Sequence, residues 1–481
     1  RQLTLMFGKI HLDCSDDRTD KAFQKYIETD RTVGDLDNRR DHLRRMDFVH
    51  MAGRLWGSLL SRIDSRIFAG DFLPKHGPGA TADRLIGNQK YSNRLWSARL
   101  DKVCSYQEAL FSSYSQYASE EAQVLSPGAE IPVKVISVPK TPKTPRLIAM
   151  EPTYMQFMQQ ALLELFVEEI ENDSLASRLV RFDSQVPNQE LARRGSLGEG
   201  FATLDLSDAS DRVSVQHVAD LLRRHKLTRE FAFASRSTKA DVRGAEIRLS
   251  KYASMGSALC FPMESLVFMT IVFLGIRRAT GHHLSRKEIT SLSRKVRTFG
   301  DDIIVPDRFA PYVVEELETF GLKVNREKSF WNGKFRESCG TDWYDGHDVS
   351  VVRVRQPLPS SRRDVEQVAA TSSLRNQLAK VGFQSVVASL DTLMKGVLGG
   401  LYPWVSGESE LVGRVDWFGG QKTINRHCPK LQVPKTKGYA IQAELPINEV
   451  DGYDALLKFF LKRGFRPLQE DHLTHSGRSR S

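Results

Sequence analysis

The chain has 481 residues, 40% of them hydrophobic and 27% charged, with a formal net charge of +10. This balance excludes a disordered or fibrous chain and predicts a globular protein of two or three domains. A positive charge favours a polyanionic partner, nucleic acid first and an anionic membrane surface second. The five cysteines are scattered without Cys-x-x-Cys spacing, which argues against a zinc site and favours a reducing cytoplasm.

The first 130 residues are predicted to be mainly helical. Residues 1–70 are rich in Arg and Asp, and a stripe of large apolar residues is spaced as one helix face that packs into the core. That stripe consists of Trp56, Leu59, Leu60 and Ile63. Proline and glycine predict a loop over 72–80, and residues 91–122 are expected to return to helix. The N-terminal apolar run is too short for a signal peptide.

Residues 131–150 form a proline-stiffened extended segment that carries Lys134, Lys140, Lys143 and Arg146. Because proline restricts the backbone, the segment is predicted to be a rigid hairpin that holds its cations outward. A solvated basic hairpin is the alternative interpretation. A guanidinium binds phosphate oxygens in a bidentate way, so Arg146 is the first candidate for a phosphate contact and Lys140 the second.

A helix is predicted from residue 152 through Phe166, and a polar loop over 182–200. Phe201–Leu206 then has the pattern of a buried strand, interrupted by Asp205. A carboxylate in a core is costly without a partner, so we expect a cation beside it. A helix over 214–225 and a short strand over 247–252 are predicted to follow.

Ser254-Met255-Gly256-Ser257 opens a predicted helix whose most apolar part is 266–276. A small-residue turn at a helix N-terminus is suited to a nucleotide or a nucleic-acid backbone. An ordinary N-cap by Ser254 or Ser257 is the alternative. The apolar run is about half of a bilayer span, so a buried helix is expected and not a membrane anchor.

The segment 296–305 has the pattern of strand, tight turn and strand, with Gly300, Asp301 and Asp302 at the corner. Adjacent carboxylates repel, and a divalent cation is the usual reason to keep them, although many such pairs are solvated turns. Asp205 precedes Asp301 by 96 residues, which leaves room for helices between two strands. Two strands that each bring a carboxylate to one place would suit two-metal phosphoryl transfer.

Further helices are predicted over 311–320, 365–378 and 383–398. Four aromatic residues are expected to give the last third of the chain its own core: Trp404, Trp417, Phe459 and Phe460. Residues 472–481 are Ser/Arg/His-rich and are predicted to be disordered.

These motifs resemble those of viral RNA-dependent RNA polymerases. Asp205 with Asp211 resembles motif A, Gly256 motif B, and Phe299-Gly-Asp-Asp motif C. Further blocks resemble the catalytic β subunit of RNA-bacteriophage (leviviral) replicases, over about residues 130 to 355. These blocks are Val138-Pro-Lys, Glu151-Pro152, Asn188-Gln189, Ala202-Thr-Leu-Asp-Leu-Ser-Asp, Ser254-Met-Gly with Glu264-Ser265, Gly300-Asp-Asp-Ile-Ile and Phe335-Arg-Glu-Ser-Cys-Gly.

The resemblance implies an α+β fold, a right-hand polymerase with fingers, palm and thumb, whose antiparallel palm sheet is flanked by helices. The implied parts are an N-terminal fingers region over 1–130, the basic motif F fingers and connection over 131–200, the palm with motifs A to E over 201–355, a helical thumb and C-terminal region over 356–471, and a disordered tail over 472–481.

It also implies site residues. Asp205, Asp301 and Asp302 would hold two Mg²⁺ ions, with Mn²⁺ as a substitute, and Lys328 would be the motif D general acid. A surface lysine is the alternative for Lys328, and Lys323 is the second candidate. The implied nucleotide-binding residues are Lys140, Lys143, Arg146, Asp211, Ser254, Gly256 and Ser257, and the implied RNA-binding residues are Lys134 and Arg336.

Three positions depart from the wider viral pattern. Phe299 stands where motif C usually has Tyr, and Cys260 and Glu264 stand where motif B has Thr and Asn. The network that senses the ribose 2′-hydroxyl therefore cannot be copied across, and Asp211 and Ser257 are the candidates for that contact.

The function implied is template-directed RNA synthesis that copies plus and minus strands of a viral genome in the cytoplasm of a bacterial host, without a membrane. The implied partners are RNA, ribonucleoside triphosphates, host elongation factors Tu and Ts, and a ribosomal RNA-binding protein. The alternatives are a capsidless-virus (mitovirus- or narnavirus-like) polymerase, a reverse transcriptase, and a non-catalytic RNA-binding protein that kept the fold.

Overall fold

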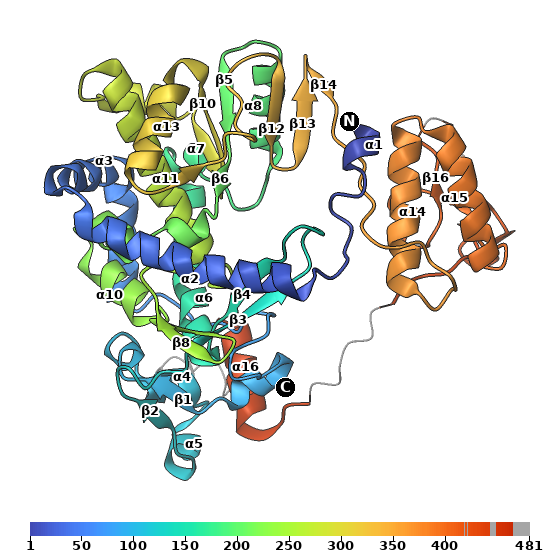
Figure 1. Ribbon diagram of the computed structural model, residues 1–481. Coiled ribbons are helices and arrows are strands. Elements are labelled where there is room, and N and C mark those ends of the chain that lie inside the picture. The colour runs from blue at the N-terminus through green and yellow to red at the C-terminus, as the bar shows by residue number, and fades with distance from the viewer. Residues whose placement is uncertain (418, 421, 443–448, 465–481) are drawn as a thin grey trace. The chain divides into compact units, whose positions relative to one another are not determined.

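The computed structural model describes residues 1–417, 419–420, 422–442 and 449–464 (Figure 1). Its contacts divide the chain into two compact units. The first comprises residues 1–22, 137–146 and 350–447, and the second comprises 23–136, 147–349 and 448–481. The boundaries of fingers, palm and thumb stay predictions, and the tail over 472–481 lies outside the described residues.

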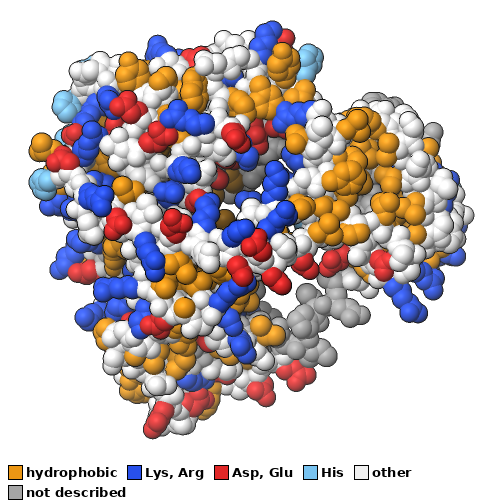
Figure 2. Space-filling view, in the orientation of Figure 1, with side chains coloured by type: hydrophobic (Ala, Val, Ile, Leu, Met, Phe, Trp, Pro, Cys, Tyr) orange, Lys and Arg blue, Asp and Glu red, His pale blue; other side chains and the backbone are white. Residues whose placement is uncertain are grey.

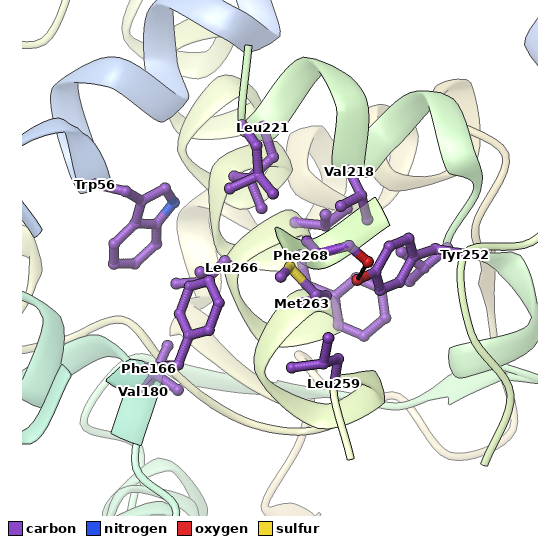
Figure 3. Close-up of a cluster of buried hydrophobic side chains, with 14 of the residues drawn as sticks. Trp56, Phe166, Val180, Val218, Leu221, Tyr252, Leu259, Met263, Leu266 and Phe268 are labelled. Atoms are coloured by element: carbon purple, nitrogen blue, oxygen red, sulfur yellow. Dashed lines mark hydrogen bonds between the residues drawn. The ribbon is translucent and has the colours of Figure 1, made fainter. Parts of the chain in front are cut away.

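The second unit is built around helix α11 (Cys260–Thr280), whose side chains are buried from Pro262 to Ile276. Helices α3 (His42–Phe68), α6 (Thr153–Asn172), α9 (Val215–Leu221) and α13 (Ala310–Thr319) pack against it. Figure 3 shows side chains of α3, α6 and α9 meeting those of α11. By length and composition α11 could cross a membrane, but 83% of its most apolar window is buried inside the protein. The prediction of a buried helix is confirmed.

The N-terminal helices are α1 (Gln2–Leu5), α2 (Asp16–Arg39) and α3. Asp41 begins α3 by accepting a hydrogen bond from the backbone N–H of Arg44. The predicted apolar stripe of α3 is buried, and its Trp56 donates from Nε1 to Thr270 Oγ1 of α11 at 3.0 Å. A buried indole N–H needs such a partner, so the bond fixes how α3 crosses α11.

A three-stranded antiparallel sheet has the order β5-β10-β9, from β5 (Phe201–Leu204), β10 (Asp302–Pro306) and β9 (Arg297–Phe299). Ile303 pairs with Leu204, and Ile303 to Pro306 are buried. Helix α8 (Val186–Ser196) packs beside this sheet, where Leu191 joins Phe201 and Ile304 in a small core cluster. Figure 1 shows β5, β10 and α8 together.

The predicted basic hairpin consists of two strands, β3 (Val133–Val138) and β4 (Arg146–Met150). They belong to a four-stranded sheet of order β4-β3-β7-β8, with β7 (Lys239–Val242) and β8 (Ala245–Arg248). Shorter pairs are β11 (Lys323–Val324) with β6 (Leu206–Ser207), and β1 (Leu95–Ser97) with β2 (Gln123–Leu125). A further sheet contains β12 (Phe335–Ser338), β13 (Thr341–Tyr344) and β14 (His347–Asp348).

The first unit contains the two helices predicted there, α14 (Val365–Lys380) and α15 (Gln384–Val397). Buried apolar residues of α14 and α15 pack on Val352 and Val354. Buried Arg375 of α14 bonds both oxygens of Asp391 of α15, at 2.7 and 3.0 Å, which locks the helix pair. Short strands follow: β15 (Trp404–Val405) with β16 (Arg414–Val415), and β17 (Arg426–His427) with β18 (Pro434–Lys435).

Residues 91–122 are not one helix, because serine caps interrupt them. Ser105 and Ser113 each accept a backbone N–H and so begin the separate short helices α4 (Tyr106–Leu110) and α5 (Tyr114–Ser119). Before these two helices come the end of η1 (Gly87–Ser92), strand β1 and η2 (Leu100–Lys102), and strand β2 follows the region.

The predicted polar loop over 182–200 is wrong, since it contains α8. A proline in its first turn and two arginines in its last turn are ordinary helix signals. The helix predicted over 214–225 is the shorter α9, which ends at Leu221, and a separate helix α10 (Lys226–Ala234) follows it. Of the strand predicted over 247–252, only the end of β8 at residues 247–248 is a strand.

The last third has core clusters of its own, but other residues than the four predicted aromatics form them, and of those four Phe460 alone is buried. The side chains of Trp417 and Phe459 are 46% and 47% exposed. Helix α16 (Gly452–Lys462) instead places Leu457 and Leu461 in the main core of the second unit. Figure 2 shows Lys and Arg side chains interspersed with Asp and Glu across the face in view.

Candidate active site

Three carboxylates meet where strands β5 and β10 end. The register that pairs Leu204 with Ile303 places Asp205 opposite Asp302 one residue further on, and Asp301 lies in the β9–β10 turn. Gly300 makes this turn with φ of +59°, and a Cβ there would lie 2.9 Å from the ring of Phe261. Only glycine fits both conditions. The fold therefore brings together the three aspartates that the sequence pattern singled out.

Burial and like charges raise the pKa values of carboxyl groups in this acidic corner. Burial raises the pKa of Asp205, which Lys328 opposes and Asp301 reinforces. Burial and the adjacent Asp301 raise the pKa of Asp302 to about 7. Burial and Asp301 likewise hold the pKa of Glu264, on α11, well above its usual range. Carboxylates crowded in this way favour a bound cation.

The donor set suits Mg²⁺ in kind, because carboxylate oxygens are its preferred protein ligands. Glu337 of β12 adds a further negative charge that acts on Asp205 and Asp302. Among the described residues, however, no group of three or more His, Cys, Asp or Glu is arranged to hold one metal ion. The residues fit a divalent cation in charge and donor type, and the individual ligands stay a prediction.

A turn after β11 supports Asp205. Asn325 donates from Nδ2 to Asp205 Oδ2 at 2.9 Å and from its backbone N–H to the Asp205 carbonyl, also at 2.9 Å. The backbone N–H of Asp205 donates to Ser329 Oγ at 3.1 Å. The exposed Lys328 lies in the same turn, which explains its electrostatic effect on Asp205. Lys323, the second candidate, is on β11 opposite Ser207. Sequence reasoning missed Asn325 and Ser329, since nothing but proximity to Lys328 marks them.

Two neighbouring side-chain amides of α8 hold the aspartate turn and the nearby β12–β13 turn. Asn188 donates from Nδ2 to the carbonyl of Asp302 at 3.1 Å, and Gln189 donates from Nε2 to the carbonyl of Cys339 at 3.2 Å. Burial and the neighbouring Asp302 raise the pKa of the Cys339 thiol to about 12. Two sequence blocks that carried the resemblance, those at 188 and 335, therefore support the acidic corner.

Arg336 was predicted to bind RNA, and the structure contradicts this. The residue is only 3% exposed, and its Nε donates to the carbonyl of Phe201 at 2.6 Å. Its Nη1 donates to three further carbonyls, those of residues 332, 333 and 335. A buried guanidinium bonded to backbone in this way ties β12 to β5 and has no surface to offer a nucleic acid.

The predicted nucleotide residues Asp211, Ser254 and Ser257 do not cap helices. The N-cap of α9 is Ser214, in a reciprocal capping box with His217, and Asp211 instead forms an ion pair with Lys251. Helix α11 begins after Leu259 without a side-chain cap. Ser257 donates to Gln159 Oε1 at 3.1 Å, and Ser254 is hydrogen-bonded to the hydroxyl of Tyr26 at 2.7 Å. The capping alternatives are therefore wrong.

Gly256 has a backbone role that no other residue can take. Its φ is +122°, and a Cβ would come 2.1 Å from the carbonyl oxygen of Ala149 on β4. The adjacent Met255 accepts the N–H of Ala149 at 2.8 Å. The loop before α11 is thus in close backbone contact with β4.

The basic residues of the hairpin are less closely placed by the structure. Lys134 is partly buried on β3 opposite Asp241 of β7. Lys140, Lys143 and Arg146 are exposed and fall in the segment 137–146, which groups with the first unit. Their phosphate and RNA contacts stay predictions.

A hairpin bearing two aspartates beside a strand that ends in a third is the arrangement the polymerase resemblance implied. The family model described as RNA replicase, beta-chain, matches residues 105–369. More than half of the chain is covered, and the chain belongs to this family.

Curated relatives are similar over part of their length. The RNA-directed RNA polymerase subunit beta of Enterobacteria phage SP is 36% identical over 229 residues, 47% of this chain and 36% of the relative. The beta chain of Escherichia phage MS2 is 34% identical over 224 residues, 47% and 38% of the two chains. The subunit beta of Escherichia virus Qbeta is 30% identical over 314 residues, which are 65% of this chain and 49% of the relative. The chain thus spans less than half of the length of these relatives.

Solved structures that are similar in part include viral polymerases. The in situ structure of the BmCPV RNA dependent RNA polymerase at quiescent state has a TM-score of 0.47 and 9% identity, over 75% of this chain and 32% of that one. The RNA-dependent RNA polymerase of a human picorbirnavirus has a TM-score of 0.37 and 14% identity, over 55% of each chain.

Proposed function

We propose that this chain carries the catalytic centre of an RNA-dependent RNA polymerase, as part of an RNA-phage replicase that copies both strands of a viral RNA genome. The observation that carries the proposal is the meeting of Asp205 with Asp301 and Asp302 at one corner of the β5-β10-β9 sheet. It occurs in a chain that belongs to the RNA replicase beta-chain family. An RNA template and ribonucleoside triphosphates are the substrates.

Each part of the proposed site has a chemical task. Asp205 and Asp301 hold two Mg²⁺ ions, with Asp302 as an additional ligand or supporting charge and Mn²⁺ as a substitute. Bound there, such ions would activate the attacking hydroxyl and stabilise the leaving pyrophosphate. Lys328 donates a proton to the pyrophosphate, and its position beside Asp205 supports this role.

The cations of the hairpin bind the triphosphate, with Arg146 first and Lys140 and Lys143 beside it. Asp211, Ser254, Gly256 and Ser257 bind the nucleoside, and Lys134 contacts RNA. Within this assignment, Asp211 accepts a hydrogen bond from the ribose 2′-hydroxyl, which deoxynucleotides lack.

The partners follow from family membership and not from any contact in the structure. We propose that the replicase works in the cytoplasm of a bacterial host with elongation factors Tu and Ts and a ribosomal RNA-binding protein.

Extension of an RNA template with ribonucleotides tests the function. We expect incorporation that requires Mg²⁺ or Mn²⁺ and that falls below about a tenth of wild type in Asp205→Asn and in Asp301→Asn, because each removes a ligand without a change in volume. Asp345→Asn is the matched control, since Asp345 is an exposed carboxylate paired with Lys334 away from the corner. Incorporation that survives in Asp301→Asn overturns the site, and equal use of deoxynucleotides favours a reverse transcriptase.

A further inference from the structure

Residues 249–252, just before the Ser254–Ser257 loop, are held on both sides of their backbone. Asp30 of α2, only 3% exposed, accepts the N–H of Ser250 at 3.0 and 3.1 Å and that of Lys251 at 3.0 Å. Buried Arg236 donates to the carbonyls of residues 249, 251 and 252 at 2.7 to 2.8 Å. Lys251 also bridges to Ser214. A segment fixed by so many bonds has one conformation.

One face of helix α2 packs along this segment. Tyr26, Asp30 and Gly34 are four residues apart and so lie on one face. A Cβ at Gly34 would come 2.7 Å from Ser250 Oγ, so the helix passes close to the strand-like segment there. Tyr26, about two turns before Gly34, reaches the hydroxyl of Ser254. This face of α2 therefore lies along the segment that leads into the Ser254–Ser257 loop.

The side chain of Lys251 has no exposed surface. Its Nζ lies 3.0 Å from Oδ1 of Asp211 and 3.3 Å from the centre of the Tyr26 ring. Burial opposes the charge on Lys251, but Asp211 and Tyr26 raise its pKa above the usual value. A buried ammonium is very costly without an anion, so Lys251 draws Asp211 to one fixed position.

The side chain of Asp211 contacts a buried cation and is also partly exposed. Its side chain is 26% exposed although its partner is fully buried. Its charge also acts on Glu264, which the charge of Asp301 reaches too, so Asp211 lies on the side of the acidic corner. With Oδ1 held by Lys251, the rotation of the carboxylate is restricted, and its other oxygen, Oδ2, is presented at a constant angle.

We propose that Lys251 is a positioning residue for ribose selection, acting through Asp211. The inference rests on the proposed function. By fixing Oδ1, Lys251 orients Oδ2 toward the 2′-hydroxyl of the incoming ribonucleotide. A site built around that hydrogen bond penalises a deoxynucleotide, which leaves the acceptor unpaired. Lys251 itself touches neither the nucleotide nor the reacting atoms.

The test compares kcat/KM for ribonucleotides and deoxynucleotides in the full chain. Lys251→Met keeps the length of the side chain and removes its charge. We expect the ribonucleotide preference to fall about tenfold or more, as in Asp211→Ala, because one hydrogen bond to a charged group sets it. The double variant should show no further fall, since Lys251 acts only through Asp211. Lys25→Met is the matched control, as Lys25 forms an exposed ion pair with Asp208, and its preference should equal that of wild type.

Thermal melting separates positioning from a structural role. A Lys251→Met protein that is folded and active, melts at a lower temperature and keeps the wild-type preference overturns the proposal. The proposal is also overturned if the double variant loses more ribonucleotide preference than Asp211→Ala alone. If Lys251→Met does not fold, Tyr26→Leu removes the ring from the ammonium, and a several-fold fall supports the proposal while an unchanged preference overturns it. A wild-type chain that incorporates no nucleotide refutes the proposed function instead.

Discussion

At the scale of single residues, Asp302 carries a strongly perturbed charge in the acidic corner. Its carboxyl is buried beside Asp301, and its pKa of about 7 lies far above the value of about 3.9 for an unfolded chain. Between these values the folded state binds a proton that the unfolded state has released. The stability that this proton contributes is present below pH 4 and is lost as the pH rises toward 7.

We therefore expect the metal-free protein to melt at a lower temperature at pH 8 than at pH 5, and Asp302→Asn to lose much of this dependence. At pH 8 the variant should melt roughly 2–6 °C above wild type. Melting curves in a chelator measure both. Excess Mg²⁺ should raise the wild-type melting temperature more at pH 8 than at pH 6, because the ion competes with the proton. Identical pH slopes in the two proteins would show that Asp302 is not the titrating group.

Arg146 permits a second prediction at this scale. In Arg146→Ala we expect a higher KM and a lower kcat for all four ribonucleotides alike, since a guanidinium on a triphosphate does not read the base. Arg248→Ala is the control, as Arg248 is an exposed arginine on strand β8 of the same sheet. A defect confined to one base would place Arg146 elsewhere than on the phosphates.

At the scale of elements, the helix pair α11 and α13 depends on a glycine. A Cβ on Gly275 would lie 2.7 Å from Cα of Val313, so the two backbones approach more closely than any side chain permits. Gly275→Ala should lower the free energy of unfolding by about 1–3 kcal/mol through overpacking. Gly57→Ala, on α3 with no atom within 4 Å of the new Cβ, should instead raise it by about 0.5–1 kcal/mol. Urea unfolding of both variants decides it, and a neutral Gly275→Ala would mean that the helices can separate at no cost.

Elements with strong periodicity or turn chemistry could be predicted from the sequence, and weakly patterned ones could not. The stripe of α3, the core helix α11 and the hairpin around Gly300 each have one dominant signal, apolar spacing or a glycine corner. Helix α8 buries few apolar side chains, so its polar composition favoured a loop. Short serine-capped helices over 91–122 depend on capping geometry that propensity alone does not reveal.

At the scale of the whole molecule, sequence reasoning located the carboxylates but not their supports. Asp205 interrupts an apolar strand pattern, and Asp301 adjoins a second carboxylate at a glycine corner between two strands, and both are visible anomalies. Asn325, Lys251 and Tyr26 have no such mark, because their roles arise only when distant segments meet. Arg336 was misassigned because a buried arginine bonded to carbonyls and an exposed one look alike in a sequence. The tertiary fold, not the local pattern, decides what these side chains do.

The hydrogen bonds that fix residues 249–252 have a consequence for hydrogen exchange. The amides of Ser250 and Lys251 end on the buried Asp30, and that of Tyr252 ends on the carbonyl of Val213. The amides of Ser250 and Lys251 can exchange with solvent deuterium only when Asp30 of α2 releases them, and that of Tyr252 only when its bond to Val213 breaks. We expect these three amides to be among the slowest to exchange, and Asp30→Asn to speed the first two selectively. By contrast, the amide of Gly244, bonded to Asp241 in an exposed turn, should exchange early, so that the segment before the Ser254–Ser257 loop stays closed while the neighbouring β7–β8 hairpin opens.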